Sequence, residues 1–304
     1  MRCPMKRIVS VLFACLLLLS VPAFSQVVKE EIVYVPLFLS GQPKGIYVVN
    51  AFEATEQSEV KDFGHYESVT NLSNDTIITV DGDALSFTMP KGRMYVQGNL
   101  KEAVLPWDIE IKFTLDGQEI APEDLSGASG DLACSIAVTP GNDVFARRLT
   151  LQMTVSLPLE KCFRIDAPKA TMATAAGSRT LAYVVLPGQS ATFEFSWQAE
   201  DFSMPGIQIA GISMSMDKDM YGGYMNSLLG DSAMGSTIQT AINNVLGRQL
   251  PPLPSFVDKE NNTVEGVQFV MLTDNVPEKP RAQENTSEQE PEENSLLDRI
   301  KNLF

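Results

Sequence analysis

The chain contains one histidine, His65, which limits the catalytic chemistry that the sequence offers. Serine and cysteine nucleophiles use a histidine to take up their proton, and the partners need not be neighbours in sequence. No Gly-x-Ser-x-Gly motif marks a nucleophile, and His65 stands in Phe63-Gly64-His65-Tyr66, a turn-like stretch. The sequence therefore predicts an ordinary surface or core histidine, and we assign no catalytic residue.

Paired acidic residues are a second source of chemistry, because two carboxylates serve glycoside hydrolysis or calcium binding. Asp81 and Asp83 flank Gly82, and Glu123 precedes Asp124. The first pair reads as a tight turn, and a chain with 38 acidic residues produces such pairs by chance. Zinc is not indicated, because there is no Cys-x-x-Cys motif and no second histidine. We therefore expect no metal ligand and no cofactor.

Methionines gather after residue 213. Met214, Met216 and Met220 have a spacing that suits Cu(I), because thioethers are soft ligands. No cysteine or histidine stands near to tighten such a site, which favours the alternative of an adaptable contact surface. We predict that Met214, Met216, Met220 and Met225 form an interaction surface.

Two cysteines, Cys134 and Cys162, lie beyond the N-terminal segment. Cys134 alternates with Leu132 and Ile136 and should point into a core, whereas Cys162 falls at or past a strand end. In an oxidising compartment two cysteines can pair. The sequence leaves two alternatives open: a disulfide between Cys134 and Cys162, or two buried free thiols.

Residues 1–25 read as a secretory signal peptide. A basic start is followed by an apolar run over residues 8–21 and by the small residues Ala23 and Ser25. The run is about fourteen residues, shorter than the ~20 that a membrane-spanning helix needs. We expect cleavage after Ser25 and an extracytoplasmic protein, in the periplasm or cell envelope. If the run is kept, it anchors the chain to the membrane.

The charge of the chain bears on its partners. The formal net charge is -15, and loss of the basic signal segment makes the mature chain more acidic still. An acidic surface repels nucleic acid and anionic lipid, which excludes both as broad partners. The hydrophobic content of 44% is ample for a real core.

The elements that must position any site read as strands. Residues 108–115 alternate apolar and polar side chains, and Asp116-Gly117 then turns the chain. Other expected strands cover residues 33–39, 46–49, 76–80, 84–88, 132–138, 149–157, 181–186, 191–197 and 264–272. Breaker-rich turns at residues 40–45 and 81–83 predict hairpins. Short strands separated by turns predict a mainly β protein of two β-sandwich-like units, the second immunoglobulin-like.

The chain divides into six expected segments. They are a signal peptide at 1–25, an N-terminal β domain at 26–105 completed by strand 264–273, an immunoglobulin-like sandwich at 106–212, a Met-rich helical segment with a Pro-rich linker at 213–263, a disordered acidic linker at 275–294, and an amphipathic helix at 295–304. The terminal helix places Leu296, Leu297, Ile300, Leu303 and Phe304 on one face, which predicts docking on a membrane or a partner.

Seven stretches of the sequence are informative when taken together: residues 45–53, 95–101, 105–109, 185–188, 201–210, 254–257 and 267–271. They resemble segments of a poorly characterised family of exported bacterial proteins. The resemblance implies an N-terminal β region and a place beside transporters of the RND superfamily, the MMPL-like exporters. Longer members carry many helical repeats where this chain has one short expected helix, so a long coiled arm is absent here.

These features predict a non-enzymatic extracytoplasmic accessory protein of an RND-type exporter, with a protein partner and peripheral membrane contact through the terminal helix. The alternative is a structural or adhesive envelope β-sandwich that binds another protein or a glycan. Phe193, Phe195 and Trp197 share one strand face, and exposed aromatic residues on a sheet would favour the glycan. A hydrolase would require two convergent carboxylates about 5–9 Å apart in a deep pocket.

Overall fold

The computed structural model describes residues 27–213, 253–261 and 264–279. The predictions for the signal peptide, for Met214, Met216, Met220 and Met225, and for the helix with Leu296, Leu297, Ile300, Leu303 and Phe304 lie outside these residues. Within them the expected mainly β fold is confirmed, with strands arranged in three sheets. A search of the described residues finds no helix long and apolar enough to cross a membrane.

The largest sheet has nine strands. In spatial order they are β13 (Thr171–Ala175), β14 (Ser178–Val185), β11 (Leu149–Pro158), β16 (Gln208–Ser213), β17 (Gly266–Thr273), β1 (Val28–Leu37), β2 (Tyr47–Ala54), β7 (Gly92–Leu100) and β4 (Tyr66–Asn71).

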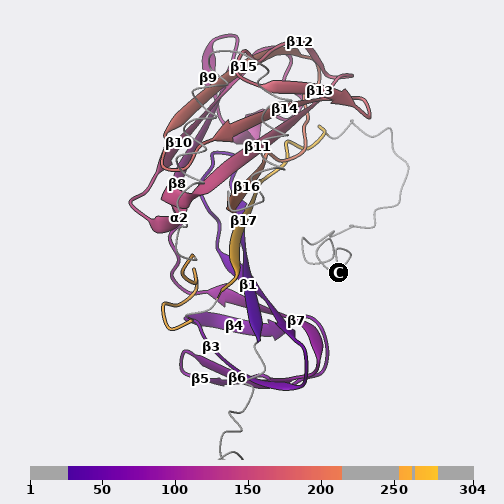
Figure 1. Ribbon diagram of the computed structural model, residues 1–304. Coiled ribbons are helices and arrows are strands. Elements are labelled where there is room, and N and C mark those ends of the chain that lie inside the picture. The colour runs from indigo at the N-terminus through magenta and orange to yellow at the C-terminus, as the bar shows by residue number, and fades with distance from the viewer. Residues whose placement is uncertain (1–26, 214–252, 262–263, 280–304) are drawn as a thin grey trace, which may run out of the picture.

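Two smaller sheets pack on the same side of the long one, one at each end (Figure 1). The five-stranded sheet runs in the order β12 (Cys162–Asp166), β15 (Ala191–Ala199), β10 (Gly130–Pro140), β8 (Trp107–Leu115) and β9 (Gln118–Ile120). The three-stranded sheet consists of β3 (Ser58–Phe63), β6 (Ala84–Met89) and β5 (Thr79–Asp81).

Strand β17 joins segments that are far apart in the sequence. It lies parallel to β1, with Val33 opposite Phe269, and antiparallel to β16, with Ala210 opposite Val270. The strand expected at residues 264–272 thus lies beside the first strand and also reaches the strands that follow residue 107. The nine-stranded sheet is therefore continuous across the boundary that the sequence places near residue 105 (Figure 1).

The large lobe is the part of the molecule between the five-stranded sheet and the long sheet. Aromatic residues from both layers meet inside it: Trp107 of β8 packs edge-on against Phe269 of β17, with ring centroids 5.2 Å apart. The ring centroids of Tyr183 of β14 and Phe193 of β15 are 4.6 Å apart. Val33, Val35 and Val48, from the N-terminal strands, belong to the same core. This core therefore draws on residues from both sides of residue 105.

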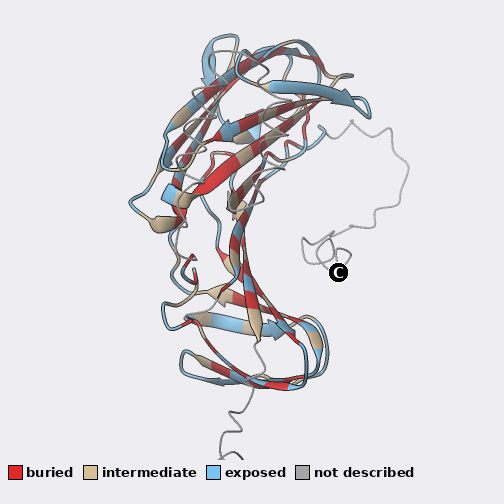
Figure 2. Cartoon of the chain, viewed as in Figure 1, coloured by how far each residue is buried: buried red, intermediate tan, exposed pale blue. Residues whose placement is uncertain are grey.

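The small lobe lies at the other end, where the three-stranded sheet covers β2 and β7. Its core is the cluster Phe52, Ala54, Val60, Phe87, Met89, Met94 and Val96. The rings of Phe52 and Phe87 meet edge-to-face at 5.3 Å. Figure 2 shows buried residues in both lobes along the same strands.

A buried layer of polar side chains separates the two cores. Lys29 and Glu31 face inward on β1, and Lys29 Nζ lies 3.0 Å from Glu31 Oε1 and 2.7 Å from Asp62 Oδ1 of β3. Glu31 also accepts hydrogen bonds from Ser255 Oγ at 2.5 Å and from the Phe256 amide at 2.6 Å. One ammonium group thus serves two buried carboxylates, and burial raises the pKa of Asp62 above its ordinary value.

Tyr66 and Asn50 extend this polar layer. Asn50 Nδ2 donates a hydrogen bond to Tyr66 Oη at 2.9 Å. The tyrosine ring lies against Gly64 and Gly98, where an added Cβ would come within 2.2 and 2.1 Å of ring atoms. Glycine at both positions is therefore required for the ring to fit.

The turns lie where the breaker residues predict them. Asp116 and Gly117 both have positive φ, at 50° and 79°, and form the two-residue loop between β8 and β9. The predicted hairpins β1–β2 and β5–β6 are also present. The sequence did not predict the short helices α2 (Val144–Arg148) and η2 (Pro122–Asp124).

Candidate binding groove

The predicted chemical groups do not come together. His65 Nδ1 lies 2.8 Å from Asp83 Oδ1, and both side chains are more than half exposed, in the loops of the small lobe. Glu123 and Asp124 lie in η2, on the other lobe. A search of the described residues finds no group of three His, Cys, Asp or Glu side chains that would hold a metal ion.

Cys134 and Cys162 are free and buried. Cys134 of β10 stands opposite Phe195 and Cys162 of β12 opposite Ala199, so strand β15 lies between them and they are offset by four residues along it. The disulfide alternative is therefore wrong for this structure, since bonded cysteines need Cα atoms within about 7 Å. Burial raises the pKa of both thiols, that of Cys162 to about 12.

The aromatic face of β15 points inward. Phe193, Phe195 and Trp197 are 7%, 3% and 2% exposed and belong to the large core. The alternation that the sequence predicts is present, but its aromatic side faces the long sheet and not the solvent. These three rings therefore offer a glycan no platform on this sheet.

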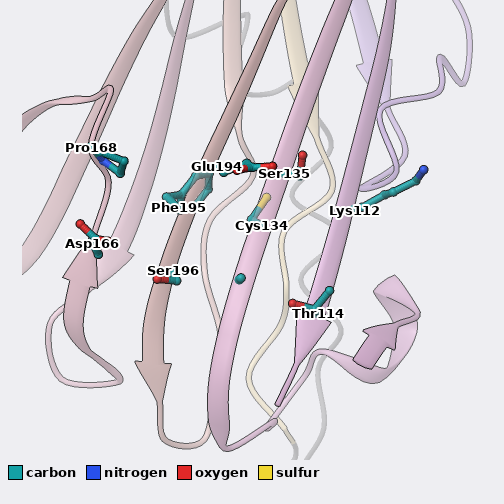
Figure 3. A pocket seen from close by; sticks show the side chains of 10 residues that line it. Lys112, Thr114, Cys134, Ser135, Asp166, Pro168, Glu194, Phe195 and Ser196 are labelled. Atoms are coloured by element: carbon teal, nitrogen blue, oxygen red, sulfur yellow. The ribbon is translucent and has the colours of Figure 1, made fainter. Parts of the chain in front are cut away.

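The opposite face of the five-stranded sheet is hollowed. A groove of about 490 Å³ lies over β8, β10 and β15, and the connection after β12 closes one side (Figure 3). Its outward-facing lining consists of Lys112, Thr114, Ala133, Ser135, Asp166, Pro168, Glu194 and Ser196. The volume lies within the range of ~300–1,000 Å³ that is common for ligand sites.

Strand alternation produces this groove. β10 is the central strand, and its inward residues are large while its outward residues Ala133, Ser135 and Ala137 are small. The neighbouring strands carry longer outward side chains, such as Lys112 on β8 and Glu194 on β15. A small central strand between two taller neighbours forms a trough along β10.

The register fixes the pattern of charges across the groove. Ser135 stands opposite Lys112 on one side and opposite Glu194 on the other, which gives a row of ammonium, hydroxyl and carboxylate. Asp166 stands opposite Ser196 and adds a second acid near the rim. Lys112 Nζ also contacts Glu110 Oε1 at 2.7 Å, and this hydrogen bond raises the pKa of Lys112.

The residues that line the groove show no arrangement of catalytic groups. No histidine lines it among the described residues, so Ser135 and Ser196 have no base beside them. Asp166 and Glu194 are exposed on different strands, and their side chains do not converge in Figure 3. What the groove offers a ligand is hydrogen-bonding groups and charges of both signs on three paired strands.

A second hollow, of about 520 Å³, lies beside the ends of β1 and β17 and the short helix η2. Phe38, Ser126 and Asp274 form part of its lining. Lys44 Nζ lies 4.8 Å above the Phe38 ring and 2.5 Å from Asp274 Oδ1. The bridge between Lys44 and Asp274 leaves Glu123 as the other charged side chain in the lining of this hollow, whereas the groove has both Asp166 and Glu194.

Sequence reasoning missed the groove. The alternation in residues 108–115 and 132–138 shows which side chains face outward, and the small outward residues of β10 are a readable signal. The sequence does not show that β8 and β15 flank β10, because β15 pairs with it across more than fifty residues of chain.

Comparison with known proteins gives no family. No protein-family model matches the chain, and no curated protein matches it. Among solved structures, the yeast delta-COP-I mu-homology domain is similar with a TM-score of 0.39 and 9% identity, over 82% of this chain and 95% of that one. The same domain complexed with a Dsl1 WxWxV peptide has a TM-score of 0.38 and the same identity and coverage. Similarity at this level says nothing about function.

Proposed function

We propose that this chain is a non-enzymatic extracytoplasmic accessory protein that binds another protein through the groove on its five-stranded sheet. The observation that carries the proposal is the trough along β10, with small residues in its floor and both signs of charge on its sides. Complementary charges select and orient a partner, while short floor residues let its backbone approach the sheet.

An extended protein segment fits this groove better than a compact ligand does. The floor follows one strand, from Ala133 to Ser135, with Lys112 on one side and Glu194 and Asp166 on the other. A segment along β10 can place a basic group near Glu194 and Asp166 and an acidic group near Lys112. The strands beneath are held by the large core, so little ordering of the groove is needed on binding.

The partner we propose is an RND-type, MMPL-like exporter. Its support is the resemblance of residues 45–53, 95–101 and 201–210 to exported proteins that stand beside such transporters. The signal-like N-terminus supports the same proposal, because a signal peptide would export the chain to the compartment where the external part of such an exporter lies. The inward position of Phe193, Phe195 and Trp197 argues against the glycan alternative.

Affinity purification of the tagged full chain from native membranes tests this function. Ser135→Tyr fills the floor of the groove, and we expect it to reduce recovery of the exporter at least tenfold. Thr139→Tyr is the matched control, because Thr139 faces outward on the same strand but does not line the groove. The proposal would be contradicted if repeated purifications of wild type recovered no transporter, or if both variants recovered the exporter equally.

A further inference from the structure

Strand β13 is an exposed edge of the nine-stranded sheet. Its sequence is Thr171-Met172-Ala173-Thr174-Ala175, and all five residues are exposed (Figure 2). Among the described strands it pairs with β14 alone. An unprotected edge presents unpaired backbone groups that another strand can use.

The other sheet edges in the described residues are protected. Strands β4 and β12 carry register irregularities and charged residues, and β12 contains Arg164 with positive φ. Strands β5 and β9 have three residues each and contain an acid. Strand β3 carries Glu59, Lys61 and Asp62. Strand β13 has no charge, no proline and a regular register, so it lacks the features that block edge pairing.

The hairpin geometry tells which backbone groups point outward. Ala176 and Gly177, with φ of 48° and 76°, form a two-residue turn that closes on the pair Ala175–Ser178. In such a hairpin the closing pair is hydrogen-bonded, and every second pair after it is too. Ala175, Ala173 and Thr171 therefore bond to β14, while the amides and carbonyls of Met172 and Thr174 point away from the sheet.

These outward groups are self-complementary about Ala173. We propose that β13 pairs antiparallel with β13 of a second copy of this chain, around a two-fold axis at Ala173. Met172 then faces Thr174 of the second copy, and each such pair exchanges two backbone hydrogen bonds. The two pairs use all four outward donors and acceptors, which a two-fold interface satisfies on both copies at once.

The side chains suit this pairing. Ala173 meets Ala173 of the second copy in the close, non-hydrogen-bonded position, where a small side chain fits. Thr171 falls opposite Ala175, and Lys169 falls opposite Gly177, so no like charges meet along the edge. Five paired residues bury far less than the ~1,200 Å² of a stable standard interface, so the dimer is weak and concentration-dependent.

Disulfide trapping tests the register. In Ala173→Cys the two introduced thiols stand opposite each other at a Cα distance of about 4.5 Å, which a disulfide spans. Mild oxidation of the purified full chain is expected to give a covalent dimer with this variant. Thr171→Cys and Ala175→Cys are expected to give one only when mixed with each other. Wild type is the control, because it carries the same Cys3, Cys15, Cys134 and Cys162 as the variants, and the structure shows the last two to be buried.

Sedimentation of the purified chain over a concentration series supplies the second readout. Wild type is expected to approach twice the monomer mass, and Ala173→Lys is expected to remain monomeric because two ammonium groups would meet at the axis. Val184→Lys, an exposed position on β14 away from the edge, should dimerise like wild type. A wild type that stays monomeric, or cross-linking equally strong from residues 171, 173 and 175 alone, overturns the proposal. Neither measurement contains an exporter, so failure here leaves the groove proposal standing.

Discussion

The two lobes share their strands but differ in what lies between the layers. The large lobe has an aromatic-rich core fed by both sheets, whereas the small lobe has seven buried apolar residues. Between the two cores, Lys29 and Glu31 of β1 are buried on the covered face of the long sheet. Asp62 of β3 is buried on the three-stranded sheet that covers it. A core of seven buried side chains is smaller than a domain usually needs to be stable by itself. The small lobe therefore depends on the shared strands and on the polar layer.

The segment at residues 253–261 strengthens this dependence. Leu253 is buried in the large core, Ser255 bonds to Glu31, and Asn261 bonds to the backbone of Phe63 at the end of β3. A stretch that the sequence reads as a linker thus fastens the small lobe to the large one. The large lobe, with the larger core, is the platform on which the groove lies.

The largest expected effect breaks the platform itself. Phe269→Ala removes a fully buried ring that contacts Trp107, Phe145 and Phe256, and should lower the free energy of unfolding by about 4 kcal/mol. Phe87→Ala is the matched change in the small lobe. Chemical denaturation measures both, and hydrogen exchange should show that the Phe87 variant loses protection in β3, β5 and β6 first. Equal loss throughout both lobes would contradict the distinction between them.

The polar layer should respond almost as strongly to loss of its one cation. Lys29→Met leaves Glu31 and Asp62 buried without a counter-charge, which should cost about 3 kcal/mol of unfolding free energy at neutral pH. The control is Lys91→Met at an exposed position, expected within about 0.5 kcal/mol of wild type. A Lys29 variant as stable as wild type would show that the layer does not hold the lobes together.

The same layer sets a pH dependence of smaller size. Burial raises the pKa of Asp62 above 3.8, so the folded chain holds this proton more tightly than the unfolded chain does. Its contribution to stability is therefore full at low pH and falls as pH rises from 3.8 through the folded pKa, by at most about 1.4 kcal/mol per pH unit. Stability of wild type relative to Asp62→Asn, measured from pH 3 upward, should decline accordingly. A flat or rising difference would mean that Asp62 is ionised without cost.

The smallest expected effect concerns the thiols of the platform. Cys134 and Cys162 are buried with raised pKa values, so alkylation of the native chain at pH 8 should leave both unmodified. Unfolding without reductant should let both react, as intact mass spectrometry would show. Modification of the native chain, or no modification after unfolding, would contradict two buried free thiols.

The sequence predicts the strands with clean alternation and misses those without it. Residues 108–115, 132–138 and 191–197 fall within β8, β10 and β15, because one face of each strand is wholly apolar. Strand β3 escapes the pattern because Asp62 faces inward, and β7 escapes it because Gly98 interrupts the inward apolar side chains of Met94 and Val96. Both interruptions belong to the junction of the lobes, where Asp62 contacts Lys29 and Gly98 lies against the Tyr66 ring, so the pattern fails where two cores meet.

The groove depends on a feature that one sequence cannot show. Each strand reveals its outward residues, but the row of Lys112, Ser135 and Glu194 exists only because β10 lies between β8 and β15. Likewise, β17 pairs with β1, although more than two hundred residues of chain separate the two strands. Local periodicity predicts the faces of strands, and non-local pairing decides which faces form a site.

Site-specific photo-crosslinking in native membranes tests the central claim most directly. A photoreactive phenylalanine analogue replaces Thr139, which faces outward on β10 beside the groove and leaves the groove floor open, and in a second variant it replaces Val80, an exposed residue of the small lobe. Binding through the groove predicts that position 139 captures an RND-type exporter, identified by mass spectrometry, and that position 80 does not. Capture from position 80 alone, or no exporter from position 139, would contradict the account.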